Sequence, residues 1–209
     1  MSVRRLAAEQ PESFAFTPET MELARWWIAK YPPERKQSAV IPVMWLVQKQ
    51  EGWVSEPAIK AIAELLGMPV IRVLEVATFY TMFQLAPVGK HHLQVCGTTP
   101  CMLRGSDDVM AACKSRGMHK GATTADGMFT LTEVECLGNC ASAPMVQIND
   151  DNYEDLDFDR TIAILDALAR GEQPKTGTQE PGRHTVEAYG GTTNLTAMVS
   201  ENHDYRGEW

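Results

Sequence analysis

The sequence of 209 residues has no long apolar run. Its longest, Ala39 to Val47, is interrupted by Pro42, and it falls far short of the roughly 20 residues that a membrane-spanning helix needs. Arg4 and Arg5 lie near the N-terminus, but acidic residues follow without an apolar stretch. We therefore expect no secretory signal and no Arg-rich transit peptide, and we expect a soluble cytosolic protein that reaches a membrane only through a partner.

Positive charge is also scarce. The chain carries 19 Lys and Arg against 27 Asp and Glu, for a formal net charge of −8. Non-specific nucleic-acid binding needs a basic face with interleaved aromatics, which the sequence does not offer. Internal repeats and low-complexity tracts are absent as well. Hydrophobic residues make up 44% of the chain, which is enough for a buried core and argues against general disorder.

Cysteine is sparse: the chain has five, an odd number, and no export signal. Thiols stay free in a reducing compartment, where spaced cysteines bind metals more often than they form structural disulfides. The cysteines are therefore the first candidates for chemistry.

The first half of the chain carries helix signals. Residues 1–16 show no periodicity and are expected to form an N-terminal arm. Thr17–Pro18–Glu19 combines a capping threonine, a proline at the first helical position and an acid in the first turn, which predicts a helix start. Three more helices are expected over about residues 38–50, from Ser55 to just before Gly67, and from Pro69 into Phe79–Tyr80. Four short helices with short links over residues 17–88 predict a four-helix bundle domain.

Tryptophan is concentrated in this half of the chain. On the first helix, Leu23, Trp26 and Trp27 form one apolar side, before Pro32–Pro33 ends the helix. We expect these tryptophans, together with Trp45 and Trp53, to fill the core of the bundle or to face a partner.

Residues 89–171 alternate strand-like and helical runs, which predicts a small α/β domain of thioredoxin size. Strands are expected over 91–95, over 129–135, and as a hairpin over 145–148 and from Tyr153; helices are expected from Ser106 to Gly117 and from Asp157 to Gly171. From Glu172 onward Gly, Thr, Pro and charges dominate. Residues 172–209 are thus expected to form an extended C-terminal tail, either a disordered end or an arm that orders on a partner. The fold class expected is α+β.

Four cysteines form two pairs. Four residues separate Cys96 from Cys101, three separate Cys136 from Cys140, and 34 lie between the pairs. Each pair follows an expected strand, so both pairs are predicted in loops at the same kind of strand end. Two such loops at one sheet edge can converge on a single site.

Soft thiolates are the ligands that iron prefers in sulfide-bridged clusters, and a [2Fe–2S] core has two tetrahedral irons that each take two protein ligands. Glycine and small residues such as Gly97, Thr98 and Gly138 allow backbone N–H groups to point at cluster sulfurs. With two ferric ions the formal charge of such a site is about −2, and one electron makes it about −3. Three alternatives remain open: a structural zinc site, a thiol catalyst, which would want C-x-x-C, and structural disulfides.

Other residues receive structural interpretations. Cys113 lies on the apolar side of an expected helix and is predicted to be a buried inert thiol. His91 and His92 are adjacent on a strand and point to opposite faces, so they are not expected to be ligands. Pro144 precedes a strand near the cysteines and either shields the site or is an ordinary turn proline.

The segments VCGTTPC (95–101) and VECLGNCASAP (134–144) resemble the cluster-binding loops of thioredoxin-like [2Fe–2S] ferredoxins. More narrowly, the chain resembles the family of the 24-kDa subunit of respiratory complex I, the NADH:quinone oxidoreductase, which is called the E subunit in bacteria. This resemblance includes VQKQEGWVSEPAI (47–59), EVATFYTMFQLAPVG (75–89), YEDL (153–156) and AYGGTTNL (188–195). It covers about residues 15–195.

The resemblance implies that Cys96, Cys101, Cys136 and Cys140 bind one [2Fe–2S] cluster. It also implies that a partner subunit binds NADH and FMN, and that the cluster accepts single electrons from that flavin. The chain would then belong to the peripheral arm of a bacterial complex on the cytoplasmic side of the inner membrane, an NADH dehydrogenase in which this chain holds no catalytic side chain. The corresponding subunit of an NAD-linked hydrogenase or formate dehydrogenase is an alternative, as are a free ferredoxin and a zinc-stapled binding module.

Overall fold

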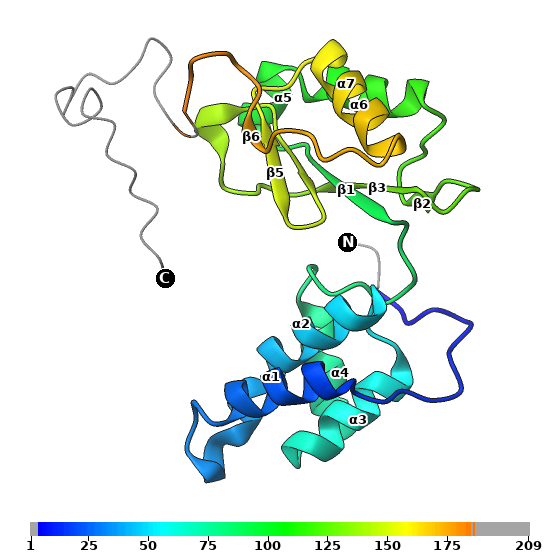
Figure 1. The fold of residues 1–209 in the computed structure, drawn as a ribbon, viewed down its shortest axis with the longest axis vertical. Helices are drawn as coiled ribbons and strands as arrows, with labels where there is room; N and C mark the ends of the chain where they lie inside the picture. Colours follow the sequence, from blue (N-terminus) through cyan, green and yellow to red (C-terminus); the bar gives the residue numbers. More distant parts are fainter. Residues whose placement is uncertain (1–3, 185, 187–209) are drawn as a thin grey trace, which may run out of the picture. The chain divides into compact units, whose positions relative to one another are not determined.

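The chain forms two compact units, Met1–Val88 and Gly89–Trp209, each of which is described by itself. The structure, a computed structural model, describes residues 4–184 and 186 (Figure 1). In this described part, no helix combines the length and the apolar character that a membrane crossing needs. The AYGGTTNL stretch that entered the family resemblance lies outside the described residues.

The first unit is helical. Its elements are α1 (Pro18–Ile28), the 3₁₀ helix η1 (Pro33–Ala39), α2 (Val40–Glu51), α3 (Glu56–Leu66) and α4 (Val70–Phe79). Thr17 caps α1 as expected: its hydroxyl accepts a hydrogen bond from the backbone N–H of Thr20 at 3.2 Å. The expected start of the second helix near Ser38 was slightly early, because η1 occupies that stretch and α2 begins at Val40.

Two glycines end helices in this unit. Gly52 follows α2 with a φ of 82°, and Gly67 follows α3 with a φ of 63°. A side chain with a Cβ rarely adopts this left-handed conformation, so glycine at these positions stops each helix without strain. Ser55 caps the start of α3 through its side chain. The predicted limits of the third helix are thus confirmed.

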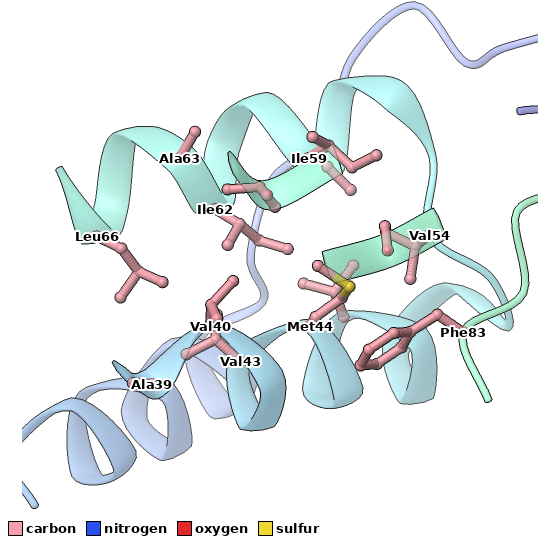
Figure 2. Packing of buried hydrophobic residues seen from close by; sticks show 14 of the residues in the cluster. Ala39, Val40, Val43, Met44, Val54, Ile59, Ile62, Ala63, Leu66 and Phe83 are labelled. Atoms are coloured by element: carbon pink, nitrogen blue, oxygen red, sulfur yellow. The ribbon is translucent and has the colours of Figure 1, made fainter. Parts of the chain in front are cut away.

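A single apolar core holds the helical unit together. The facing sides of α2 and α3 supply most of it, and Phe83 packs against the same cluster from the segment after α4 (Figure 2). The buried side chains on these two helices are Val40, Val43, Met44, Val47, Ala58, Ile59, Ile62, Ala63 and Leu66.

The apolar side expected on α1 does not join this core. Leu23 and Trp26 remain 49% and 55% exposed, and Ala24 is the buried residue of the helix. The Lys30 ammonium lies 3.6 Å from the centroid of the Trp26 ring, a cation–π contact that a half-exposed indole can make. Of the two alternatives expected for Trp26, the core position does not hold, and the position facing a partner stays a prediction.

The second unit is built on a six-stranded sheet in the order β2-β3-β1-β4-β5-β6. The strands are β1 (His91–Cys96), β2 (Ala122–Thr123), β3 (Phe129–Val134), β4 (Val146–Ile148), β5 (Asp151–Glu154) and β6 (Gly177–Thr178). β1 and β3 run parallel, whereas β4 pairs antiparallel with both β1 and β5. A parallel pair needs a crossover connection, and α5 (Thr99–Arg104) and α6 (Ser106–Ser115) provide it.

Two helices cover one face of this sheet. α6 and α7 (Phe158–Ala169) lie side by side on it (Figure 1). Alternate strand residues, among them Leu93, Leu131 and Val146, pack with Val109 of α6 and Leu165 of α7 in one buried cluster. The alternation follows from the two-residue period of a strand, which sends every second side chain to the helical face.

Several features of this unit differ from expectation, and the two-residue strand β2 is one of them. The short helix α5 was not predicted, since six residues are too few to show a periodic pattern. Ser106 does not cap α6 with its side chain but lies buried in the first turn, and Gly105 occupies the capping position. The expected C-terminal tail is not without structure throughout, because β6 adds a parallel strand beside β5.

Candidate iron–sulfur site

The two cysteine pairs meet because β1 and β3 are neighbouring parallel strands. Cys96 is the last residue of β1 and pairs in register with Val134, the last residue of β3. Parallel strands end at the same edge of a sheet. The chain therefore leaves both strands at one edge, where Cys136 follows β3 by two residues and Cys101 follows β1 by five.

Short helical turns carry the second cysteine of each pair. Cys101 lies in α5, whose start has a proline at Pro100, and Cys140 opens the 3₁₀ helix η2 (Cys140–Ser142). The expectation that all four cysteines lie in loops was therefore wrong for Cys101 and Cys140, and also for Cys96, which is the last residue of β1.

The thiols lie close to one another. Cys136 Sγ and Cys140 Sγ are 3.6 Å apart, and Cys96 Sγ lies 3.4 Å from the Thr98 hydroxyl. Cys101 and Cys96 share a side-chain hydrogen bond that affects the ionisation of both, and Cys140 interacts with Cys136 and Cys96. All five cysteines of the chain are free thiols, so the disulfide alternative finds no support here.

Hydrogen-bond donors converge on the sulfurs. The Gly138 N–H donates to Cys136 Sγ at 3.4 Å, which lowers the pKa of the Cys136 thiol. Burial by itself raises the pKa of Cys96, but donors from Thr98 and the Leu137 backbone outweigh it and lower the value on balance. Donors of this kind favour the thiolate, the form that binds iron. The small residues of both loops were expected to play this part.

The other two thiols hold their protons more tightly. Burial, helped by the hydrogen bond with Cys96, raises the pKa of Cys101 to about 12. The side-chain hydrogen bond with Cys136 raises the pKa of Cys140. Four adjacent thiols cannot all ionise without a cation between them, because each thiolate raises the cost of the next. A positive charge bound between the four thiols would therefore stabilise their ionised forms.

The site is asymmetric. Cys96 and Cys101 are each 1% exposed and pack with Ala143 and Met145, whereas Cys136 and Cys140 are exposed. Two apolar side chains of α5, Met102 and Leu103, are also exposed next to the buried pair. One side of the site therefore faces the protein interior and the other faces the surface.

The donor set fits a diiron cluster. Within the described ranges, no group of three or more His, Cys, Asp or Glu side chains is arranged to hold a metal ion. The four thiols form two pairs, Cys96 with Cys101 and Cys136 with Cys140, and a [2Fe–2S] cluster takes two thiolates on each iron. A donor set made of free thiols, with N–H groups beside them, agrees with iron–sulfide chemistry.

Of the remaining candidate residues, Cys113, His91 and His92 make their contacts outside this site, whereas Pro144 lies between Ala143 and Met145, which pack with Cys96 and Cys101. Cys113 on α6 is completely buried in the core of the sheet unit, and burial raises the pKa of its thiol to about 11, as expected of an inert thiol. His92 Nε2 lies 2.9 Å from the Thr132 hydroxyl, so His92 is a satisfied structural side chain. The His91 ring packs on Phe129. Pro144 follows Ala143 through a cis peptide bond.

The sequence pattern did not predict one set of contacts. Asp155 and Arg183, far apart in the chain, form a buried ion pair that reaches the loop after Cys140. The only signal in the sequence was the YEDL segment, which contributed to the resemblance but had no assigned role.

Known proteins are similar to this chain in sequence. Residues 24–169 match the family model of the thioredoxin-like [2Fe-2S] ferredoxins. The chain is 54% identical over 158 residues to the E subunit of NADH-quinone oxidoreductase of Rickettsia bellii (strain RML369-C), with 75% of this chain and 95% of that protein aligned. It is 49% identical over 205 residues to an E subunit of NADH-quinone oxidoreductase, the one numbered 1, of Rhizobium meliloti (strain 1021), with 94% of this chain and 74% of that protein aligned.

A solved structure shares the fold at low sequence identity. A chain of an NAD⁺-reducing [NiFe]-hydrogenase in the H₂-reduced state superposes with a TM-score of 0.54 at 19% identity. The match covers 63% of this chain and 22% of that chain, and it concerns the fold alone. On the family model and the two oxidoreductase relatives together, this chain belongs to the thioredoxin-like [2Fe-2S] ferredoxin family.

Proposed function

We propose that this chain is the iron–sulfur electron carrier of an NADH-quinone oxidoreductase, in the place that the E subunit takes there. The observation that carries the proposal is the meeting of four free thiols, two from each of two chain segments, at the shared edge of β1 and β3. The names of relatives at 54% and 49% identity support the assignment to that complex.

We propose Cys96, Cys101, Cys136 and Cys140 as the ligands of one [2Fe–2S] cluster, two on each iron. When bound, the cluster would supply one-electron chemistry, since it takes up and releases a single electron. The chain contributes the thiolates and the N–H groups that favour their ionised form, of which Gly138 N–H at 3.4 Å from Cys136 Sγ is one. No acid–base side chain is needed, because the cofactors carry the chemistry.

The electron donor in this proposal is the FMN of a partner subunit that also binds NADH. The exposed side of the site, with Cys136, Cys140 and the apolar side chains of Met102 and Leu103, is the side a partner can approach. Exposed apolar groups beside a redox site are suited to docking. The complex would attach this chain peripherally to the cytoplasmic side of a bacterial inner membrane.

The domain assignment belongs to the same proposal. The division of the chain at Val88 and Gly89 supports a helical domain over residues 17–88, in which α1 to α4 form a four-helix bundle, and a cluster domain over residues 89–171. The arm (1–16) and the tail (172–209) complete the chain.

Cluster binding is tested by metal analysis and electron paramagnetic resonance of the purified chain. We expect about two irons and two sulfides per chain, a red-brown colour, and after dithionite reduction one spin per two irons. The variants Cys136→Ala and Cys140→Ala should lose the cluster, while the control Cys113→Ala should keep it. A colourless protein that holds zinc and no iron would exclude the proposal and favour the zinc-stapled module.

The membership of a complex needs a second experiment. We expect the chain to purify with an NADH-binding flavoprotein and with NADH:quinone activity when it is isolated from its own cells. Purification with hydrogenase activity would instead favour the diaphorase subunit of an NAD-linked hydrogenase, an alternative supported by the fold shared with the hydrogenase chain.

A further inference from the structure

Residues 141–144, which follow Cys140 and are called the Cys140 loop, are held by groups from distant parts of the chain. The Asp155 N–H donates a hydrogen bond to Ser142 O at 2.9 Å, and the Leu156 N–H donates one to Pro144 O at 3.1 Å. A guanidinium N–H of Arg183 donates to Ala141 O at 2.8 Å, and the backbone N–H of Val186 donates to the Ser142 hydroxyl at 3.1 Å. Cys140 itself lies exposed in a single 3₁₀ turn, so its position depends on these contacts.

Arg183 is the central residue of this arrangement. Its guanidinium forms an ion pair with the Asp155 carboxylate, and the two side chains are only 7% and 2% exposed. The second Asp155 oxygen accepts a hydrogen bond from the Thr178 hydroxyl. A planar guanidinium can satisfy the carboxylate and the Ala141 carbonyl together, which the point charge of an ammonium group does less well.

Asp155 is itself held in an unusual position. Its φ is 53°, in the left-handed region that a residue with a Cβ rarely adopts. The Arg160 guanidinium donates to the Asp155 carbonyl at 2.6 Å and pairs with Glu180 at 2.6 Å. Asp155 therefore lies between α7, the segment after β6 and the Cys140 loop.

We propose that the segment of residues 177–184 with Val186, which we name the C-terminal brace, positions Cys140, with Arg183 as the key positioning residue. The inference rests on the proposed cluster. Through its contacts with Ala141 and Ser142 the brace would fix the exposed end of the site. Arg183 would also place one buried positive charge, and Asp155 one buried negative charge, next to the Cys140 loop.

The Arg183–Asp155 pair allows a test that distinguishes an electrostatic effect on the cluster from a general loosening of the fold. Reduction adds one negative charge to the cluster. Removal of the Arg183 charge should therefore lower the midpoint potential, whereas removal of the Asp155 charge should raise it. Loss of packing alone would not give shifts of opposite sign.

The experiment uses the full-length, cluster-loaded chain with Arg183→Ala, Arg183→Lys and Asp155→Asn. The controls are Arg116→Ala and Asp166→Asn, which disrupt an arginine–aspartate pair of similar chemistry between α6 and α7 that is 43% and 41% exposed. Iron release to a chelator, the spectrum of the reduced cluster and the midpoint potential are measured, and circular dichroism checks the fold.

We expect Arg183→Ala to release iron at least ~10-fold faster than the wild type, since a hydrogen bond from a charged group contributes about that factor or more. Arg183→Lys should fall between the two, and the controls should match the wild type. Arg183→Ala and Asp155→Asn should shift the potential in opposite directions. If Arg183→Ala does not fold, iron release from Arg183→Lys that is faster than from the wild type, together with the upward shift of Asp155→Asn, carries the test.

Two outcomes separate the proposals. A wild-type chain without iron would refute the proposed function before any variant is compared. A wild-type chain with its cluster, and brace variants that match the controls in release rate and potential, would refute the brace alone.

Discussion

Cys113 provides a sharp test of the division between binding and structural thiols. It is 0% exposed in the core of the sheet unit, and burial raises its pKa from 9.0 to about 11. Because only the thiolate is nucleophilic, the thiolate fraction at pH 8 falls from about one in ten to about one in a thousand. We expect iodoacetamide to alkylate Cys113 in the native protein at least ~100-fold more slowly than in urea.

The assay is peptide mass spectrometry of cluster-loaded protein after timed alkylation at pH 8, with urea-unfolded protein as the reference. Steric exclusion adds to the chemical factor, so ~100-fold is a lower bound. Alkylation of native Cys113 at a rate close to that of the unfolded chain would show that α6 does not bury this thiol, and the assigned core would then be wrong.

The raised pKa of Cys113 also predicts how the stability of the folded chain depends on pH. A raised pKa means that the folded state holds the proton more tightly than the unfolded state, so the stabilisation is complete below pH 9 and is lost as pH rises toward 11. Two pKa units correspond to about 3 kcal/mol. Urea unfolding of the wild type and Cys113→Ala should therefore show an advantage of the wild type that shrinks by about 2 kcal/mol between about pH 8 and pH 11, where half of the folded thiol is still protonated. An advantage that stays constant over this range would contradict the reasoning.

Three further substitutions test other parts of the structure. Ile62→Ala in the core of the helical unit should lower the free energy of unfolding by about 2–5 kcal/mol, measured by thermal unfolding. The control Lys60→Ala breaks an exposed ion pair on the same helix and should change it by less than about 1 kcal/mol. Equal effects would show that Ile62 is not in the core. Asp157→Ala removes the side-chain cap of α7 and should cost about 1 kcal/mol, measured by urea denaturation, and no loss would mean that the cap is dispensable. Thr98→Val removes the hydroxyl 3.4 Å from Cys96 Sγ and should keep the iron but lower the midpoint potential, because a donor that stabilises added negative charge is lost; a higher potential would refute that role.

Much of the local structure could be predicted from the sequence because its causes are local. Thr17 before Pro18 starts a helix, Gly67 ends one, and Asp157 caps another, and each works through the backbone of its own neighbours. The strands that lead to Cys96 and toward Cys136 were predicted from alternation and turn residues. Errors appeared where elements were too short to show a period, as in α5 and β6.

The spacing of the cysteines also predicted one shared site from the sequence alone. Two pairs after two strands already predicted a shared site, which iron fitted well, while zinc, thiol catalysis and disulfides stayed open. What the spacing left open was how the pairs meet, since that depends on the parallel pairing of β1 with β3 through a crossover, a long-range contact.

The sequence by itself therefore determined the start of α1, the limits of α3, the strands β1 and β3 and the two pairs of candidate thiols, because each of these depends on residues close together in the chain. The tertiary structure alone decided that Cys96 and Cys101 are buried while Cys136 and Cys140 are exposed, that Trp26 lies outside the core, and that Arg183 reaches the Cys140 loop. Burial and ion pairing depend on segments that are distant in the sequence and that folding brings together, and a local sequence pattern does not show which segments will meet.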